Sequence, residues 1–162
     1  MIEARFCLRC GAALEKRLTE ERERLACPSC AFVFYDNPLP VVAAIVEHEG
    51  EVVLVRQHGW PDKWLGIVTG FLERGETPEQ GILREVKEEL GLGGEVVSLV
   101  GAYAFPQRNE IIIAYHVRAS GEIVLGAELE RFKKVAIDKL QPWPFGTGLA
   151  VRDWLARRHA AA

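Results

Sequence analysis

The sequence lacks the features of a membrane or secreted protein. No apolar run approaches the roughly 18 residues that span a bilayer. The opening MIEARFCLRC has no apolar stretch of the kind found in a secretory signal. A large charge of either sign is also missing, since the net charge is −3, so electrostatics give no general case for nucleic acid as a partner. We therefore expect a cytoplasmic location, no membrane partner and no nucleic-acid partner.

Internal repeats and low-complexity segments are absent too. Of the 162 residues, 49% are hydrophobic and 27% are charged, which is ordinary globular composition and argues against disorder. This length allows one well-buried domain and a small appendage.

No cysteine follows residue 30. The four cysteines form two CxxC pairs, Cys7 with Cys10 and Cys27 with Cys30. In a reducing cytosol this spacing favours a zinc site over disulfides or a redox-active pair. Four protein ligands leave no position for a catalytic water, so we predict a structural Zn²⁺ and expect the chemistry elsewhere.

We assign residues 1–36 to a zinc ribbon and residues 37–162 to a second domain. Between the cysteine pairs, the charged segment 15–24 is expected to be a solvated hairpin or loop, and residues 31–35 a strand. The proline-containing segment 36–40 is the expected linker. Because the ribbon lacks a sustained basic stripe, we favour support of the fold or of a homodimer interface over nucleic-acid binding.

The second domain is rich in predicted strands. Residues 41–47 and 51–57 read as a hairpin around a turn at residues 48–50, and the nearly all-apolar first run suits a central strand. Segments 95–105 and 110–119 read as long strands, 128–134 as helical or irregular, and 149–158 as a final helix. This mixture predicts an α/β architecture layered around a mixed sheet.

One helix, over residues 78–90, is strongly predicted. Thr77 can cap it, Pro78 suits its first turn and Gln80 can complete a capping box. Gly91 is a natural terminator. The predicted buried stripe consists of Ile82, Leu83, Val86 and Leu90.

Three glutamates crowd one face of that helix. Glu85, Glu88 and Glu89 are spaced i, i+3 and i+4, where like charges repel by a few tenths of a kcal/mol per pair. An ordinary solvated acidic face is the simpler explanation. However, the three carboxylates are adjacent, and the glycine-containing loop 70–75 precedes them. Such oxygen clusters suit Mg²⁺ or Mn²⁺, and Mg²⁺ often completes its shell with substrate phosphates.

The segment from Gly70 to Leu92 resembles the Nudix box in every fixed position. The match consists of Gly70, Glu76 and REVKEELGL at residues 84–92, and so long a motif is specific. The CxxC pairs followed by YDNP at residues 35–38 are similar to the zinc-ribbon-bearing Nudix proteins, including NADH pyrophosphatases. The resemblance implies an α/β/α sandwich.

For the chemistry, the resemblance implies metal-dependent hydrolysis of a nucleoside diphosphate linked to another group X. Glu85, Glu88 and Glu89 would hold divalent Mg²⁺ or Mn²⁺, with the Gly70 carbonyl as a further ligand. Glu85 would also orient or deprotonate the attacking water. The products would be a nucleoside monophosphate and a phosphorylated X.

Arg84 resembles the family's ion-pair partner of Glu76, which braces the loop against the helix. We expect Arg84 to support catalysis by orienting Glu85. The catalytic residues that we predict are Arg84, Glu85, Glu88 and Glu89.

The sequence specifies the substrate less closely than it specifies the reaction. NADH pyrophosphatases carry SQPWPFPxS soon after the box, whereas this chain has YAFPQR at residues 103–108 and a late QPWPF at residues 141–145. A dinucleotide such as NADH or FAD, or ADP-ribose, is the expected small-molecule substrate. The alternative is a nucleotide-sensing or nucleic-acid-binding protein with little turnover, which usually shows an eroded box.

Several residues outside the box are candidates for the site. Arg56 can contact a phosphate, although a surface ion pair is equally expected. An extra acidic ligand, which Nudix enzymes often recruit, is Glu110 or the competing Glu128. The aromatic candidates for stacking on a base, each also a candidate for the core, are Trp64, Tyr103 and Phe105.

Overall fold

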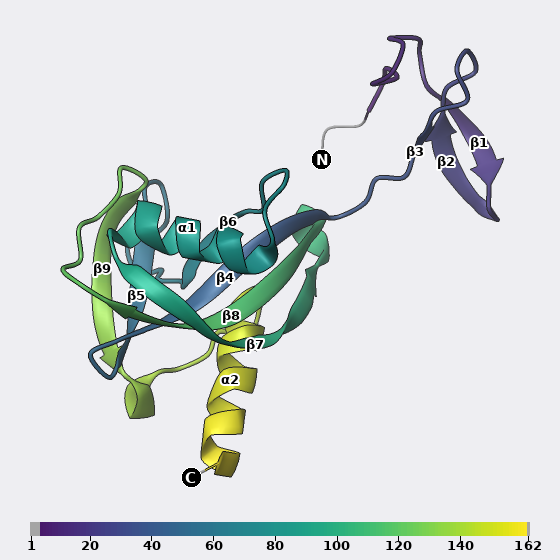
Figure 1. The fold of residues 1–162 in the computed structure, drawn as a ribbon. Coiled ribbons are helices and arrows are strands. Elements are labelled where there is room, and N and C mark those ends of the chain that lie inside the picture. The colour runs from purple at the N-terminus through teal and green to yellow at the C-terminus, as the bar shows by residue number, and fades with distance from the viewer. Residues whose placement is uncertain (1–3, 162) are drawn as a thin grey trace. The chain divides into compact units, whose positions relative to one another are not determined.

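A computed structural model describes residues 4–161 and divides the chain into two compact units after Pro38 (Figure 1).

The first unit contains a small antiparallel sheet in the order β1-β2-β3. The predicted hairpin is present, and its two turn residues, Glu20 and Glu21, have φ of 50° and 63°. The third strand is shorter than predicted; Ala31 has a left-handed φ of 58°, which lies outside the β region. The strands are β1 (Glu15–Thr19), β2 (Arg22–Ala26) and β3 (Val33–Phe34).

The second unit is built on a mixed six-stranded sheet. Its order is β7-β8-β4-β5-β9, with β6 paired to β4. Only β4 and β8 run parallel; the other pairs are antiparallel. The strands are β4 (Leu39–His48), β5 (Glu51–Gln57), β6 (Val68–Phe71), β7 (Gly93–Phe105), β8 (Glu110–Ser120) and β9 (Leu129–Ala136). The helices are α1 (Pro78–Leu90) and α2 (Gly148–Ala161), and the short 3₁₀ turns are η1 (Pro106–Arg108) and η2 (Ile137–Lys139).

Strand β4 is the centre of the sandwich. Side chains alternate between the faces of a strand, so Val42 and Val46 pack with α1 while Val41 and Ile45 pack with α2. The two helices thus cover opposite faces of the sheet (Figure 1). The predicted α/β layering and the central position of this apolar strand are both confirmed.

Helix α1 begins and ends as predicted. The Thr77 hydroxyl accepts from the Gln80 N–H, and the Gln80 side chain accepts from the Thr77 N–H, which completes the capping box. Gly91 ends the helix with φ of 70°, a left-handed conformation that costs glycine little. These ends fix where the acidic face of α1 lies along the sheet.

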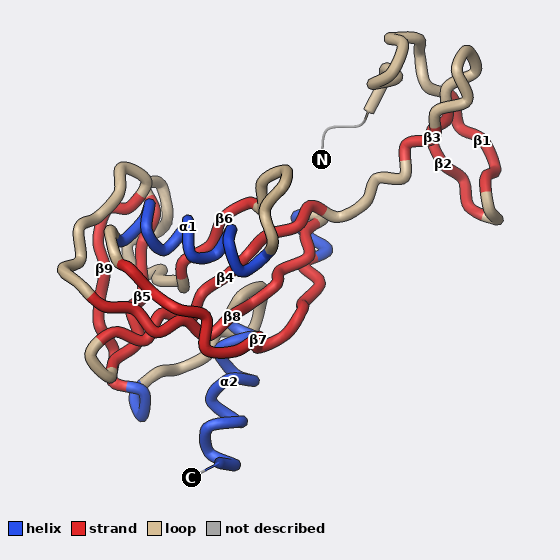
Figure 2. The backbone as a smooth tube through the Cα atoms, viewed as in Figure 1, coloured by secondary structure: helices blue, strands red, loops and turns tan. Residues whose placement is uncertain are grey.

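The prediction for residues 128–134 was wrong. This charged segment is mostly strand β9, which pairs along β5 at the edge of the sheet (Figure 2). An edge strand can expose charged side chains on one face, so its composition resembled that of a surface helix. In residues 4–161, no helix combines the length and apolar character needed to cross a membrane.

Candidate active site

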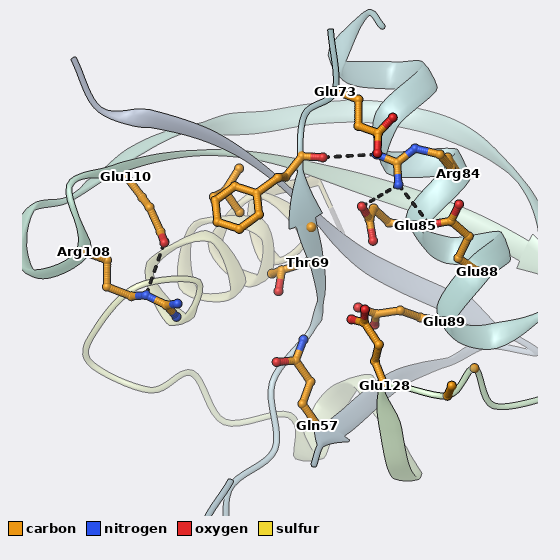
Figure 3. A pocket seen from close by; sticks show the side chains of 15 residues that line it. Gln57, Thr69, Glu73, Arg84, Glu85, Glu88, Glu89, Arg108, Glu110 and Glu128 are labelled. Atoms are coloured by element: carbon orange, nitrogen blue, oxygen red, sulfur yellow. Dashed lines mark hydrogen bonds and ion pairs between the residues drawn. The ribbon is translucent and has the colours of Figure 1, made fainter. Parts of the chain in front are cut away.

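The acidic face of α1 lines a cavity of about 550 Å³ beside β6 (Figure 3). The lining residues come from α1, from β4, from the end of β5, from β6 and its following loop, from η1 and the start of β8, and from the segment before β9. Acidic residues dominate the lining: Glu73, Glu85, Glu88, Glu89, Glu110 and Glu128. The fold therefore collects carboxylates from distant parts of the sequence around one hollow.

Gly70 allows Glu85 to approach the backbone of β6. A Cβ on residue 70 would lie 1.9 Å from Cδ of Glu85, far inside any van der Waals contact. Gly70 is held in register opposite Val42 of the central strand, so the backbone cannot easily withdraw. A side chain at position 70 and the observed position of the Glu85 carboxylate are thus incompatible.

Arg84 ties the acidic helix to the preceding loop. Its Nε donates to Oε1 of Glu76 at 2.7 Å, and its Nη1 donates to Oε1 of Glu85 at 2.7 Å and to Oε2 of Glu88 at 3.0 Å. Nη2 donates to Oε2 of Glu76 and to the carbonyl oxygen of Phe71, both at 3.1 Å. The guanidinium holds the pKa of Glu76 below its usual value. This fork fixes the loop and two of the three helix carboxylates together.

Glu89 is the least satisfied of the carboxylates. Its side chain is buried, and neither oxygen has a hydrogen-bond partner among the described residues. Burial, and then the negative charges of Glu85 and Glu128, raise the pKa of Glu89 to about 8, against the opposing effect of the nearby Gln57 side chain. Burial also raises the pKa of Glu85, against the opposing effect of Arg84. A buried acid without a partner is costly, so a cation in front of Glu89 would relieve both burial and repulsion.

These donors fit a hard divalent cation. The cavity presents carboxylate oxygens from one helical face, the ligand type that Mg²⁺ and Mn²⁺ prefer. The unpaired oxygens of Glu89 and the space kept clear by Gly70 are the two features that a simple surface cluster would not need.

The two acidic candidates from outside the 70–92 segment, Glu110 and Glu128, occupy different parts of the cavity. Glu128 lies beside Glu89, and Gln57 at the end of β5 lies near both (Figure 3). Glu110 lies across β6 from them and pairs with Arg108, whose Nε is 3.2 Å from Oε1 of Glu110. Gln57 was not among the predicted site residues, because a polar residue ending a buried strand gives no distinctive signal.

A second cavity, of about 540 Å³, adjoins the first. The two share four lining residues, and two of the aromatic candidates, Trp64 and Phe105, line the second. Trp64 and Phe145 lie with ring centroids 5.9 Å apart. The sequence did not predict the contribution of residues 60 and 143–145, which the fold brings to the same place. We call this the aromatic cavity; its aromatic lining residues are Trp60, Trp64, Phe105, Trp143 and Phe145.

Two predicted substrate-binding residues lie elsewhere. Arg56 is buried; it donates to the carbonyl oxygen of Trp60 and to Oδ1 of Asp62 and pairs with Glu130. It lines neither cavity and instead anchors the loop that carries Trp64. Tyr103 donates to Oδ2 of Asp153 at 3.0 Å and packs against the α2 side of the core.

The four cysteines converge within the first unit. Their Sγ atoms all lie within 4.8 Å of one another, with Cys7 and Cys30 at 3.6 Å and Cys10 and Cys27 at 3.5 Å. A tetrahedral zinc with Zn–S bonds of about 2.3 Å separates its sulfurs by about 3.8 Å, whereas a disulfide needs about 2.05 Å. The cluster therefore fits zinc and does not fit disulfides.

Comparison with known families identifies the larger unit. A family model described as NUDIX domain matches residues 37–154. The chain belongs to the Nudix hydrolase family. A second family model, described as Nudix N-terminal, matches residues 5–36, so this Nudix hydrolase carries an N-terminal zinc ribbon, as its sequence indicated.

The Nudix chain is also similar to curated proteins. It is 31% identical over 164 residues to a protein from Pseudomonas aeruginosa named NAD-capped RNA hydrolase NudC, covering 98% of this chain and 58% of that protein. It is 29% identical over 159 residues to the protein of the same name from Stutzerimonas stutzeri, covering 95% and 57%. The chain thus spans less than two thirds of the length of these relatives.

Solved structures share the fold. A NUDIX hydrolase from Nitrosomonas europaea superimposes with a TM-score of 0.82 at 25% identity, over 97% of this chain and 93% of that one. An ADP-ribose pyrophosphatase from Streptococcus suis superimposes with a TM-score of 0.62 at 20% identity, over 75% and 92%. The first match extends over the ribbon as well as the Nudix domain, since it covers nearly the whole chain.

Proposed function

We propose that this Nudix hydrolase cleaves the pyrophosphate bond of a nucleoside diphosphate linked to X, in a reaction that depends on a divalent metal. The single observation that carries the proposal is the buried, unpartnered carboxylate of Glu89, placed beside Glu85 and Glu128 in an open cavity. Carboxyl groups whose pKa is raised by burial and by neighbouring negative charges are typical of functional sites.

The residues that we assign to the divalent ions, Mg²⁺ or Mn²⁺, are Gly70, through its carbonyl, Glu85, Glu88 and Glu89. As the acidic residue from outside the box we choose Glu128 over Glu110. Glu128 raises the pKa of both Glu85 and Glu89 through its charge, whereas Glu110 already has Arg108 as its partner. Bound there, the ions would neutralise phosphate charge and lower the pKa of a water ligand.

Glu85 is the proposed general base. It accepts a proton from water as the water oxygen attacks one phosphorus; the bond from that phosphorus to the bridging oxygen breaks, and the bridging oxygen leaves with the other phosphate. The products are a nucleoside monophosphate and a phosphorylated X. Arg84 positions Glu85 through its 2.7 Å hydrogen bond and does not itself need to contact the substrate.

The aromatic cavity is the proposed site for a base of the substrate. Trp64 and Phe105 offer flat apolar surfaces there, and stacking on such rings tolerates any base. A dinucleotide such as NADH or FAD, or ADP-ribose, has both the aromatic group and the pyrophosphate that the adjoining cavities suit. The name of the curated relatives adds NAD at the end of an RNA to the substrates worth testing.

For the ribbon, comprising residues 1–36, we propose a structural Zn²⁺ held by Cys7, Cys10, Cys27 and Cys30. The boundary at residues 36 and 37, the cytoplasmic location and a homodimer stay predictions.

The test is a panel of anhydrides incubated with the full chain and Mg²⁺, with the products separated and identified. The panel contains NADH, FAD, ADP-ribose, NAD-capped RNA and a nucleoside triphosphate. We expect a nucleoside monophosphate from at least one of the first four. Complete absence of turnover across the panel, with binding of nucleotide or of RNA retained, would instead favour a sensing protein.

A further inference from the structure

We call the first cavity, which the glutamates of α1 line, the carboxylate cavity. Arg108 lies where this cavity meets the aromatic cavity. It is one of four residues that line both hollows, with Val41, Thr69 and Glu110. In Figure 3 it lies on the far side of β6 from the helix carboxylates. A substrate that spans the two cavities would pass directly by its guanidinium.

The position of Arg108 is fixed by its neighbours in the chain. The 3₁₀ turn that contains it ends at Asn109, in a left-handed conformation with φ of 52°. The carbonyl oxygen of Asn109 then accepts from the N–H of Leu39 at 2.8 Å, and β8 begins at Glu110. The turn is thus joined to the central strand of the sheet on which both cavities rest.

Glu110 holds the guanidinium of Arg108 in an ion pair at 3.2 Å. Its side chain is 9% exposed, whereas that of Arg108 is 65% exposed. The carboxylate contacts Nε, and most of the arginine side chain remains open to solvent and to the cavities. The buried carboxylate of Glu110 therefore places an exposed cation beside both cavities.

Arg108 differs from the other charged residues that line the carboxylate cavity. Among the described lining residues, the only cations are Arg84 and Arg108. Arg84 is fully engaged by Glu76, Glu85 and Glu88. Arg108 is therefore the cation of the lining that can still receive an anion, and a guanidinium matches a phosphate in geometry and charge.

We propose that Arg108 binds the phosphate of the nucleotide half whose base occupies the aromatic cavity, and that Glu110 is its positioning residue and not a metal ligand. The inference rests on the proposed function for the identity of the substrate. It narrows the ligand of the aromatic cavity to a nucleoside 5′-phosphate unit, recognised by its base and its phosphate together.

The binding test compares AMP with adenosine, without added divalent metal. Trp60, Trp64 and Trp143 line the aromatic cavity, so tryptophan fluorescence should report occupancy. We expect the wild-type chain to bind AMP more tightly than adenosine, and Arg108→Ala to weaken AMP binding about tenfold while adenosine binding is unchanged, because a charge-assisted hydrogen bond is lost. Equal affinities of the wild type for the two ligands, failure of AMP to bind, or an unaffected Arg108→Ala would overturn the proposal.

Arg118→Ala is the matched control. Arg118 also pairs with a glutamate, Glu95, at 3.2 Å, and its side chain is 59% exposed, but it lines neither cavity. We expect its affinity for AMP to equal that of the wild type. A loss equal to that of Arg108→Ala would mean that the effect is general electrostatics, and would refute the assigned contact.

Kinetics separate positioning from metal ligation at Glu110. On a substrate identified by the panel, Glu110→Gln should raise KM in parallel with Arg108→Ala, with kcat within about twofold and the Mg²⁺ dependence unchanged. A fall in kcat together with a higher Mg²⁺ requirement would identify Glu110 as a metal ligand and contradict its role as the positioning residue of Arg108. If no substrate is turned over, the proposed function fails, while the AMP comparison still decides the role of Arg108.

Discussion

The carboxylate of Glu85 lies against the backbone of Gly70, where a Cβ would stand 1.9 Å from Glu85 Cδ. These residues belong to different elements, β6 and α1, and Arg84 holds the carboxylate of Glu85 in place with a 2.7 Å hydrogen bond. The missing side chain at residue 70 is therefore a requirement of the site.

Replacing Gly70 by Ala should reduce kcat by roughly 100-fold, since a displacement of about 1 Å in a catalytic group can cost that much. The loss of stability should stay within about 1 kcal/mol, because the displaced atoms are the end of a flexible side chain. Steady-state kinetics and denaturant unfolding measure the two effects. Gly93→Ala is the control, because a Cβ there meets nothing within 4 Å. Wild-type activity in Gly70→Ala would show that the position of Glu85 does not matter.

Metal binding should release protons at pH 7. The pKa of Glu89 is raised to about 8 in the metal-free chain, so its carboxyl group is mostly protonated at pH 7 and must lose that proton to bind a cation. Calorimetry with Mg²⁺ in two buffers of different ionisation enthalpy counts the protons. We expect about one more proton released at pH 7 than at pH 9, and Glu89→Gln should remove this difference. Equal release at both pH values in the wild type would mean that Glu89 is ionised before the metal arrives.

The ribbon should contain one zinc per chain, held by the four thiolates that lie within 4.8 Å of one another. Cys27→Ser should abolish zinc binding and open residues 1–36 to proteases, because a zinc site contributes folding energy directly. Elemental analysis and limited proteolysis are the measurements, and Ser29→Ala, which changes a neighbour that is not a ligand, should keep the metal. A zinc-free wild-type chain with oxidised cysteines would contradict the assignment.

The sequence predicted correctly those structural features that depend on residues close together in the chain. The limits of α1 follow from the local cap at Thr77 and from Gly91, and the spacing of the glutamates followed from the helix itself. The two CxxC pairs likewise converge as their spacing indicated.

Features that depend on tertiary contacts were harder to predict. Strand β9 forms because β5 supplies its hydrogen-bond partners, and nothing within residues 128–134 signals that pairing. Arg56 is the second-last residue of β5, close to the carboxylate cavity in sequence, but the loop at residues 60–62 folds over it and engages its guanidinium. Trp64 and Phe145 meet only because two loops that are distant in sequence converge. The sequence therefore predicted only some of the residues that line the aromatic cavity.

The most direct test of the central claim is the rate of Glu85→Gln beside that of the wild type, with Mg²⁺ at saturation and a substrate identified by the panel. The change keeps the size of the side chain but removes the base and the negative charge. We predict a fall in kcat of roughly 100- to 1000-fold, with an unfolding transition like that of the wild type. An unchanged rate in a folded Glu85→Gln chain would contradict the account.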